Sequence, residues 1–452
     1  MTKKLSPLLV LFRQDLRITD NPALFYACKT SRPIIPLYIL DEKSPGKWKM
    51  GAASNSWLHF SLKRLNESLI EKGSRLFLYK GETLKIVQSL IERYNVRAIF
   101  WNHAYEPYWI KVEKKFKELL PLSEGFKGSL LFEPTDIINK QGEPFKIFTP
   151  FWRRCLEVLE IKAPLPAPIT IHTENIMGEE LNSWKLLKSY PENLESSTIG
   201  EKAAQVKLEY FLKNSLKSYA NDRDIPSLDC TSKLSPHLHF GEISPGQVIY
   251  CAQHNAKFLS EIGWREFCYY QLFHFPELPE KPWRSEYAHF PWEKNANFLE
   301  KWQQGQTGYP LVDAGMRELR TTGIMHNRVR MITASFLIKD LFIHWKTGAE
   351  WFWQTLVDAD LANNSASWQW VAGCGFDAAP FFRIFNPILQ SKKFDPEGSY
   401  IKKFVPELAH LPKAFIHQPW DKAPDYARPL VNHEEARKKA LNSFKLLRKR
   451  AL

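Results

Sequence analysis

One segment of this chain, Gly323–Phe382, combines residue types that could bind a polar ring system and exchange electrons with it. It holds several tryptophans, an Asn-Asn pair and an Arg-x-Arg sequence on an otherwise apolar stretch. Tryptophan rings serve as core packing, stacking platforms or redox groups, and residue type alone leaves all three roles open. Asp358 and Asp360 are two positions apart, so only an extended or turn segment could aim both at one ligand.

Two other stretches carry polar and aromatic side chains at spacings that share a helical face. Glu261 and Trp264 are separated by three positions, and Asn327 and Met331 by four. An indole beside a carboxylate suits a flat polar ring, which could stack on one and donate hydrogen bonds to the other. The Asn327 amide could bond to a base edge, and Arg328 could hold a phosphate. As isolated residues, these side chains fit packing and surface polarity equally well.

A cluster of hydroxyl side chains precedes a helix-like run. Thr231, Ser232 and Ser235 could cap that helix, or hold an anion at its positive end together with backbone N–H groups. Lys233 adds a point charge. Capping and anion binding both remain open from the residues alone.

The overall composition suits a large folded protein with a polyanionic partner. The 452 residues predict two or three domains, and 44% hydrophobic residues allow a large core. The net charge of +13 favours nucleic acid first and an anionic membrane second, although a merely basic enzyme would look the same. None of the six cysteines forms a C-x-x-C pair, so we expect no metal site and no disulfide framework, in agreement with a cytoplasmic protein. No signal peptide and no apolar run of about 18 residues is found.

The first part of the chain alternates strand-like and helix-like segments, which predicts a parallel sheet with crossover helices. No G-x-G-x-x-G follows the first strand, and GCGFDA at 373–378 is interpreted as a turn. The expected strands are Leu8–Phe12, Ile34–Leu40, Leu76–Tyr79, Ala98–Trp101 and Leu130–Phe132.

Beyond this part, strand signals nearly vanish. Proline-rich and polar stretches predict a linker, and helical patterns follow. We therefore predict an α/β domain at 1–132, a linker at 133–198 and an all-α domain at 199–452. The basic tail from His433 is expected to be helical, with its charges on a solvated face.

Several of these motifs, in this order, closely resemble the photolyase/cryptochrome family. They are LFRQDLRITDNPAL (11–24), RDIPSLDCTSKLSPHLHFGEISP (223–245), EIGWREFCYYQL (261–272), MHNRVRMI (325–332) and DADLANNSASWQW (358–370). The resemblance implies a Rossmann-like α/β antenna domain followed by a larger all-α domain that binds FAD, active as FADH⁻.

The resemblance also implies a set of cofactor-binding residues. Asn364 would face flavin N5, and Arg330 would balance the acids that meet the flavin and ribose. The SAS sequence at 365–367 departs from the Asn-Gly-Gly of many relatives. The implied cofactor residues are Tyr219, Thr231, Ser232, Lys233, Leu234, Ser235, Arg265, Arg330, Asp358, Asp360 and Asn364.

A second implied set would contact the substrate. Enzymes of the family that act on (6-4) photoproducts carry a second histidine where Asn327 stands, so the pattern looks like that of class I cyclobutane pyrimidine dimer photolyases. The implied substrate residues are Glu261, Trp264, Asn327, Arg328, Met331 and Trp370. Trp368, Trp345 and Trp292 match the family's electron-transfer chain, with Trp292 as an exposed outer member.

The expected function is light-driven DNA repair. The resemblance implies that photoexcited FADH⁻ gives an electron to a dimer flipped out of single- or double-stranded DNA, which splits the cyclobutane ring. A cryptochrome-type light receptor, a (6-4) photolyase and a basic flavoprotein without photochemistry are the alternatives. A cryptochrome would be expected to carry a longer C-terminal extension. WNHAYEPY (101–108) lies where relatives hold a folate or deazaflavin antenna, and the sequence leaves that choice open. We expect a monomer without membrane attachment.

Overall fold

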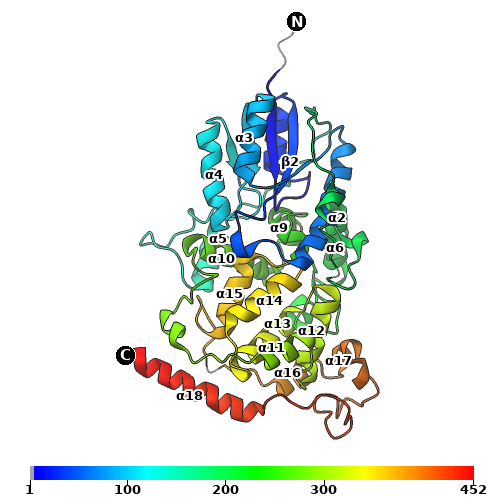
Figure 1. The fold of residues 1–452 in the computed structure, drawn as a ribbon, viewed down its shortest axis with the longest axis vertical. Helices are drawn as coiled ribbons and strands as arrows, with labels where there is room; N and C mark the ends of the chain where they lie inside the picture. The colour runs from blue at the N-terminus through cyan, green and yellow to red at the C-terminus, as the bar shows by residue number, and fades with distance from the viewer. Residues whose placement is uncertain (1–4, 189, 382, 452) are drawn as a thin grey trace.

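The computed structural model describes residues 5–188, 190–381 and 383–451. An α/β unit occupies one end of an elongated molecule and a helical unit occupies the other (Figure 1). The predicted fold class, a parallel α/β domain followed by a larger all-α domain, is confirmed.

A five-stranded parallel sheet forms the α/β unit, in the order β3-β2-β1-β4-β5. The central strand β1 pairs Leu8 with Ile34 of β2 on one side and with Ala98 of β4 on the other. Both faces of the sheet are buried, one under α1 and α2 and the other under α3 and α4. This burial explains the continuous apolar runs of the inner strands. The elements are β1 (Leu8–Phe12), α1 (Pro22–Lys29), β2 (Ile34–Leu40), α2 (Ala52–Ile70), β3 (Phe77–Lys80), α3 (Thr83–Tyr94), β4 (Ala98–Asn102), α4 (Pro107–Leu119) and β5 (Glu124–Phe126).

The fifth strand corrects the sequence prediction. It is Glu124–Phe126, and not Leu130–Phe132. This short edge strand is half-exposed and lacks an apolar run, so it leaves no periodic signal. The N–H groups of Leu131 and Phe132 instead donate to the Glu266 carboxylate of the helical unit, at 2.9 and 3.4 Å. Their burial comes from domain contact and not from the sheet.

The segment 133–198, predicted as a linker, has structure of its own. It contains α5 (Phe148–Val158) and two short 3₁₀ helices, Leu181–Trp184 and Ser196–Thr198. α5 packs on the helical unit, whereas Trp184 is buried in the core of the α/β unit. The segment therefore lies against both units.

Helices make up the second unit, as predicted. Its main core surrounds buried aromatic residues such as Trp302, Trp345 and Trp368. α13 continues directly into a π-helical turn, Phe336–Asp340. The helices are α6 (Glu201–Asn214), α7 (Tyr219–Asp222), α8 (Ser235–His239), α9 (Pro245–Ala252), α10 (Ala256–His274), α11 (Ala296–Gln304), α12 (Pro310–Thr322), α13 (Asn327–Ser335), α14 (Trp345–Thr355), α15 (Leu361–Ala372), α16 (Pro387–Phe394), α17 (Ser399–Phe404) and α18 (His433–Ala451).

Buried hydrogen bonds join the two units close to α8. The Trp57 indole donates to the Glu242 carboxylate at 3.1 Å, and the Arg17 guanidinium donates to the Gly241 carbonyl at 2.9 Å. Gly241 has a φ of +66°, and a Cβ there would lie 2.0 Å from the Gln14 carbonyl oxygen. A glycine is therefore required at this contact. The start of the chain and the α8 region are held in one fixed arrangement.

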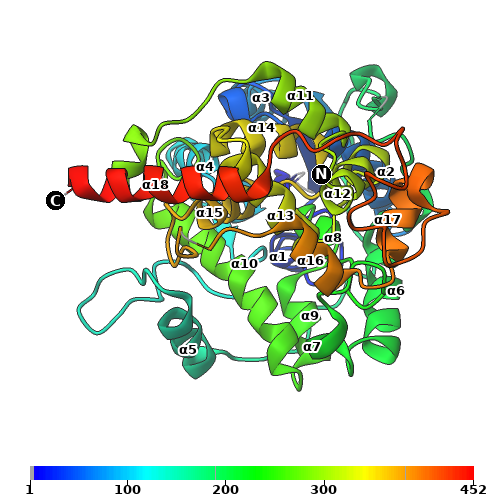
Figure 2. The ribbon, with the colours of Figure 1, turned by 90° about the horizontal axis from the view of Figure 1, so that it is seen from below.

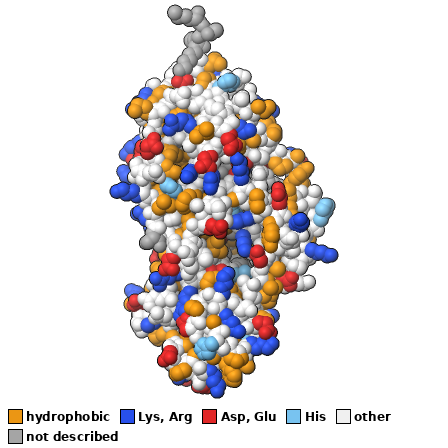
Figure 3. Space-filling model, turned by 90° about the vertical axis from the view of Figure 1, so that its right-hand side faces the viewer, with side chains coloured by type: hydrophobic (Ala, Val, Ile, Leu, Met, Phe, Trp, Pro, Cys, Tyr) orange, Lys and Arg blue, Asp and Glu red, His pale blue; other side chains and the backbone are white. Residues whose placement is uncertain are grey.

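The surface carries both signs of charge. On the face drawn in Figure 3, Lys and Arg side chains are interspersed with Asp and Glu. Within the described part of the chain, no helix is long and apolar enough to cross a bilayer.

Candidate functional site

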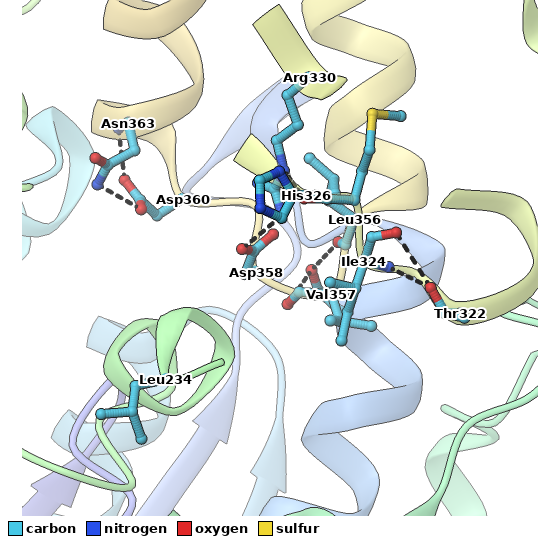
Figure 4. Close-up of polar contacts among 12 residues, drawn as sticks. Leu234, Thr322, Ile324, His326, Arg330, Leu356, Val357, Asp358, Asp360 and Asn363 are labelled. Carbon is cyan, nitrogen blue, oxygen red and sulfur yellow. Dashed lines mark hydrogen bonds and ion pairs between the residues drawn. The ribbon is translucent and has the colours of Figure 1, made fainter. Parts of the chain in front are cut away.

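The two aspartates of the first candidate segment lie at the entry to α15 and contact different partners. Asp358 is in a turn, and its carboxylate accepts a hydrogen bond at 2.9 Å from the Arg330 guanidinium of α13 (Figure 4). Asp360 is the N-cap of α15 and accepts from the backbone N–H and the amide of Asn363, both at 2.7 Å. The expectation that a non-helical segment presents both acids is confirmed, because Asp360 has extended backbone angles.

Their electrostatics differ because only one acid has a direct counter-charge. Burial alone would raise the pKa of Asp358, but the Arg330 charge and hydrogen bond outweigh it, so the pKa lies below its ordinary value. Burial raises the pKa of Asp360 to about 6, against the hydrogen bonds of Asn363 and the charge of Arg265. Asp358 is thus ionised at neutral pH, whereas the Asp360 carboxyl titrates close to neutral pH.

A third side chain faces this acid pair from α8, and sequence reasoning missed it. Ser235 and His239 share a face of α8, and after Arg330 the Ser235 side chain also lowers the pKa of Asp358. His239 is buried, and burial lowers the pKa of His239 to about 4, so the ring is neutral at pH 7. Its Nδ1 and the Oδ1 of Asp358 are buried without a hydrogen-bond partner among the described residues. The i, i+4 spacing from Ser235 was the available sequence signal.

The residues predicted to hold an anion, Thr231, Ser232 and Lys233, lie just before α8. Ser232 accepts a hydrogen bond from the Leu234 N–H at 3.4 Å, and Thr231 is half-buried beside it. The Lys233 ammonium forms an ion pair at 2.6 Å with Asp229, and both side chains are half exposed. Lys233 is therefore already neutralised, which differs from the free point charge that the sequence suggested.

The remaining predicted cofactor residues surround the same region. Asn364 is buried in α15 and donates from its amide to the Ala349 carbonyl at 2.9 Å. Arg265 donates to the Ser129 carbonyl at 3.0 Å and contributes positive charge at both Asp360 and His239. The Ser365–Ser367 departure causes no break, because α15 runs unbroken through it.

The two helices with predicted substrate residues are connected by a pair of consecutive residues. Arg223 forms an ion pair with Glu261 of α10, and the next residue, Asp224, accepts from Arg328 of α13 at 2.6 Å. Glu261 also pairs with Lys257 at 3.1 Å. The structure therefore brings Glu261 and Arg328 to opposite ends of one charged bridge. Sequence reasoning missed Arg223 and Asp224, although they begin one of the quoted motifs.

The other predicted substrate residues differ in their surroundings. Trp264 stacks on Phe148 of α5, with ring centroids 3.9 Å apart and planes at 9°. Met331 lies 3.9 Å from an Arg328 nitrogen, and Trp370 is half-buried. Asn327 is the first residue of α13 and is exposed. One face of the Trp264 indole is thus already covered, which the sequence did not indicate.

Comparison with known proteins decides the family. A family model described as the FAD binding domain of DNA photolyase matches residues 258–446, and another described as DNA photolyase matches residues 8–169. A deoxyribodipyrimidine photo-lyase from Agrobacterium fabrum is 44% identical over 99% of this chain and 100% of its own length. The chain belongs to the DNA photolyase family.

Other similar proteins are named as cryptochromes or as photolyases. Cryptochrome-2 of Arabidopsis thaliana is 37% identical over 95% of this chain and 77% of its own length. A bacterial class III photolyase structure from Agrobacterium tumefaciens has a TM-score of 0.93 and 42% identity, with 99% of both chains covered. An archaeal photolyase structure from Sulfolobus tokodaii, with two FAD molecules, has a TM-score of 0.86 and 31% identity over 97% of this chain and 99% of its own. Class I membership stays a prediction.

The three tryptophans predicted as the photolyase electron-transfer chain lie in one aromatic region. The His344 ring lies between Trp345 and Trp292, with centroid distances of 5.5 and 5.0 Å. Trp368 packs against α14 at Gly348, where a Cβ would lie 2.1 Å from its ring. Trp292 is half-buried and not exposed as predicted, and its indole nitrogen is buried without a partner among the described residues.

The residues around Asp358 fit the FAD of this photolyase-family domain. The Oδ1 of Asp358 and the Nδ1 of His239 are buried polar atoms, and a bound polar ligand would satisfy their hydrogen bonds. Arg265 and Arg330 supply the positive charge that a diphosphate and a reduced flavin need. The predicted residues Tyr219 of α7 and Leu234, which directly precedes α8, are both buried.

Proposed function

We propose that this protein repairs cyclobutane pyrimidine dimers in DNA in a light-dependent reaction. The observation that carries the proposal is the charged bridge from Glu261 through Arg223 and Asp224 to Arg328. It fixes two helices relative to each other, and each presents side chains that suit a flipped-out pyrimidine dimer. The relatives named deoxyribodipyrimidine photo-lyase support the same reaction class.

FAD, when bound and reduced, would supply the photoexcited electron. The protein's part is to hold the cofactor and to set the charge around it. Asp358, held ionised by Arg330, would bond to the cofactor through its free Oδ1. Asn364 would present an uncharged amide near the flavin, since its NH₂ is turned toward Ala349 and its oxygen remains to accept. Asp360 would meet the ribose region.

The lesion would be bound between α10 and α13. The free face of Trp264 and the Met331 side chain would contact the stacked bases, together with Trp370. The exposed Asn327 amide could donate to and accept from base edges without losing an internal partner. A dimer already disturbs base stacking, so its extrusion costs less than that of a normal base pair.

Two other functions compete within the family. A (6-4) photolyase would need a different base-edge contact at Asn327, and a cryptochrome-type receptor would act through protein partners. The Arabidopsis thaliana relatives named as cryptochromes are about as similar to this chain as some relatives named as photo-lyases, so similarity alone does not decide between the two functions. Asn327 is the residue that favours dimer repair.

The decisive experiment offers the reduced, illuminated protein two matched oligonucleotides, one with a cyclobutane dimer and one with a (6-4) photoproduct. We expect repair of the first only. Asn327→Ala should lower dimer affinity by about 1–3 kcal/mol without releasing FAD, because a base-edge hydrogen bond is lost. Asn182→Ala, at an exposed asparagine of the 181–184 segment, is the matched control and should leave repair unchanged. Repair of only the (6-4) lesion would refute the proposal, and repair of neither would favour a receptor.

A further inference from the structure

The last helix, α18, carries a strong surplus of positive charge at one end of the molecule. Residues 433–449 of α18 hold six Lys and Arg against two Asp and Glu, and residues 383–449 together hold 14 against 7, a net +7 of the chain's net +13. α18 lies at the end of the molecule opposite the α/β unit; its beginning is near α13 and α16, and its C-terminal end points away from them (Figures 1 and 2). About half of the chain's net charge thus lies in its last 70 residues, which belong to the helical unit.

α18 is fixed to the protein by its inner face. His433 Nδ1 bonds to the buried Asp340 carboxylate at 2.6 Å, and Phe444 stacks on Phe381 with centroids 4.8 Å apart. Ala440 and Leu447 are buried. A helix with these anchors keeps its outer face in a constant position. The inner face of α18 is therefore packed against the protein, and its opposite face meets solvent.

The outer face of α18 presents a regular row of lysines. Lys438, Lys445 and Lys449 are seven and four residues apart, so they lie on one side of the helix over about 16 Å. All three are exposed, and none forms an ion pair with another described residue. Lys439, on another line, is paired with Glu293. The unpaired row is the part of α18 that is free to meet an anionic partner.

We propose that this lysine row binds the phosphate backbone of DNA outside the lesion pocket. The inference rests on the proposed function for the identity of the nucleic acid. Charge complementarity supports it, because 16 Å of duplex axis carries roughly five phosphates of one strand, at about 3.4 Å of axis for each. A lipid surface is the poorer partner, since a membrane-bound helix needs a free apolar face and that of α18 is used internally.

A basic path connects α18 to the substrate residues. The Arg328 guanidinium lies 4.5 Å over the Phe394 ring of α16. α16 also carries exposed Lys392 and Lys393, and the exposed Arg383 precedes it. The Arg383 carbonyl is held at 2.8 Å by the buried Lys339 of the π-helical turn. A strand that enters the lesion site could therefore continue toward α18 over positive surface.

The test replaces the row by Lys438→Gln, Lys445→Gln and Lys449→Gln together. The matched control carries Lys111→Gln, Lys114→Gln and Lys117→Gln on α4, which removes the same charge from the α/β unit. Lys111, Lys114 and Lys117 are exposed and, like the row, form no ion pair with another described residue. Affinity for a 40-base-pair duplex with one dimer, and for an undamaged duplex, is measured against salt concentration with the FAD-loaded protein.

We expect the log–log salt slope to fall by about 2–3 in the α18 variant and by less than 1 in the control, since each lost phosphate contact removes roughly 0.9. Repair of an isolated dimer dinucleotide should be equal in all three proteins. An unchanged slope, or equal losses in both variants, would overturn the proposal. So would loss of binding to phosphatidylglycerol vesicles with no change on DNA. Failure of the wild type to repair the dinucleotide would refute the proposed function alone, because the undamaged duplex still tests α18.

Discussion

The Arg330–Asp358 ion pair allows the sharpest test of how the cofactor region is held together. The Asp358 side chain is almost fully buried, with 1% exposed, and one of its carboxylate oxygens has no hydrogen-bond partner among the described residues. Arg330→Gln would leave that buried charge without its counter-ion. Because removing one partner of a buried pair is far more costly than removing both, we expect a loss of about 3–5 kcal/mol in the free energy of unfolding at pH 7.5.

The loss should depend on pH in a defined direction. In the wild type the pKa of Asp358 lies below its ordinary value, since Arg330 outweighs the effect of burial. Without Arg330, burial would raise the pKa of Asp358, and the carboxyl would fold best when protonated. The difference in stability between wild type and variant should therefore shrink as the pH falls from 7.5 to 5.

The assay is urea unfolding of flavin-depleted proteins, followed by circular dichroism at both pH values. Arg317→Gln is the matched control, because Arg317 also donates to one backbone carbonyl and one carboxylate, but its partner Glu407 is 42% exposed. We expect the control to lose 0–1 kcal/mol from its ion pair. Arg330→Gln with Asp358→Asn should regain about 1–3 kcal/mol over the single variant. A loss below about 1 kcal/mol, or no recovery in the double variant, would refute the reasoning.

Two further predictions concern the aromatic chain and the acid side of the pH range. Trp292→Phe should slow photoreduction of oxidised FAD by an external donor, while dimer repair by the chemically reduced protein persists. Trp351 is a half-buried tryptophan of α14, and the control Trp351→Phe should leave photoreduction and repair unchanged. Equal photoreduction in the two variants would exclude Trp292 from the electron-transfer chain. His239 has a pKa of about 4 in the fold against 6.5 when unfolded, so its contribution is lost as the pH falls from 6.5 through 4. Between pH 7 and 4.5 the wild type should lose about 2 kcal/mol more unfolding free energy than His239→Gln, as measured by urea titration, and equal losses would contradict the assignment.

The sequence by itself determined the parts of this protein that depend on local patterns. The inner strands and the amphipathic helices follow from apolar periodicity, which acts over neighbouring residues. The helix caps are also local. Asn21, Ser244 and Asp360 are the N-caps of α1, α9 and α15, and each side chain accepts a hydrogen bond from a backbone N–H of the first turn. The motif residues could be named for the same reason, because their spacing and order are properties of the chain.

Tertiary structure decided everything that depends on contacts between distant residues. The edge strand β5 has no apolar run, and Leu131 is held by Glu266, 135 residues away. The Arg223 and Asp224 bridge, the neutral His239 and the partial burial of Trp292 each arise from packing between segments that are distant in the sequence. Such contacts form only when the whole fold brings the elements together, and desolvation then sets the charge of each group. The chemistry of the residues was readable in the sequence, whereas their partners and protonation states were fixed by the assembled core.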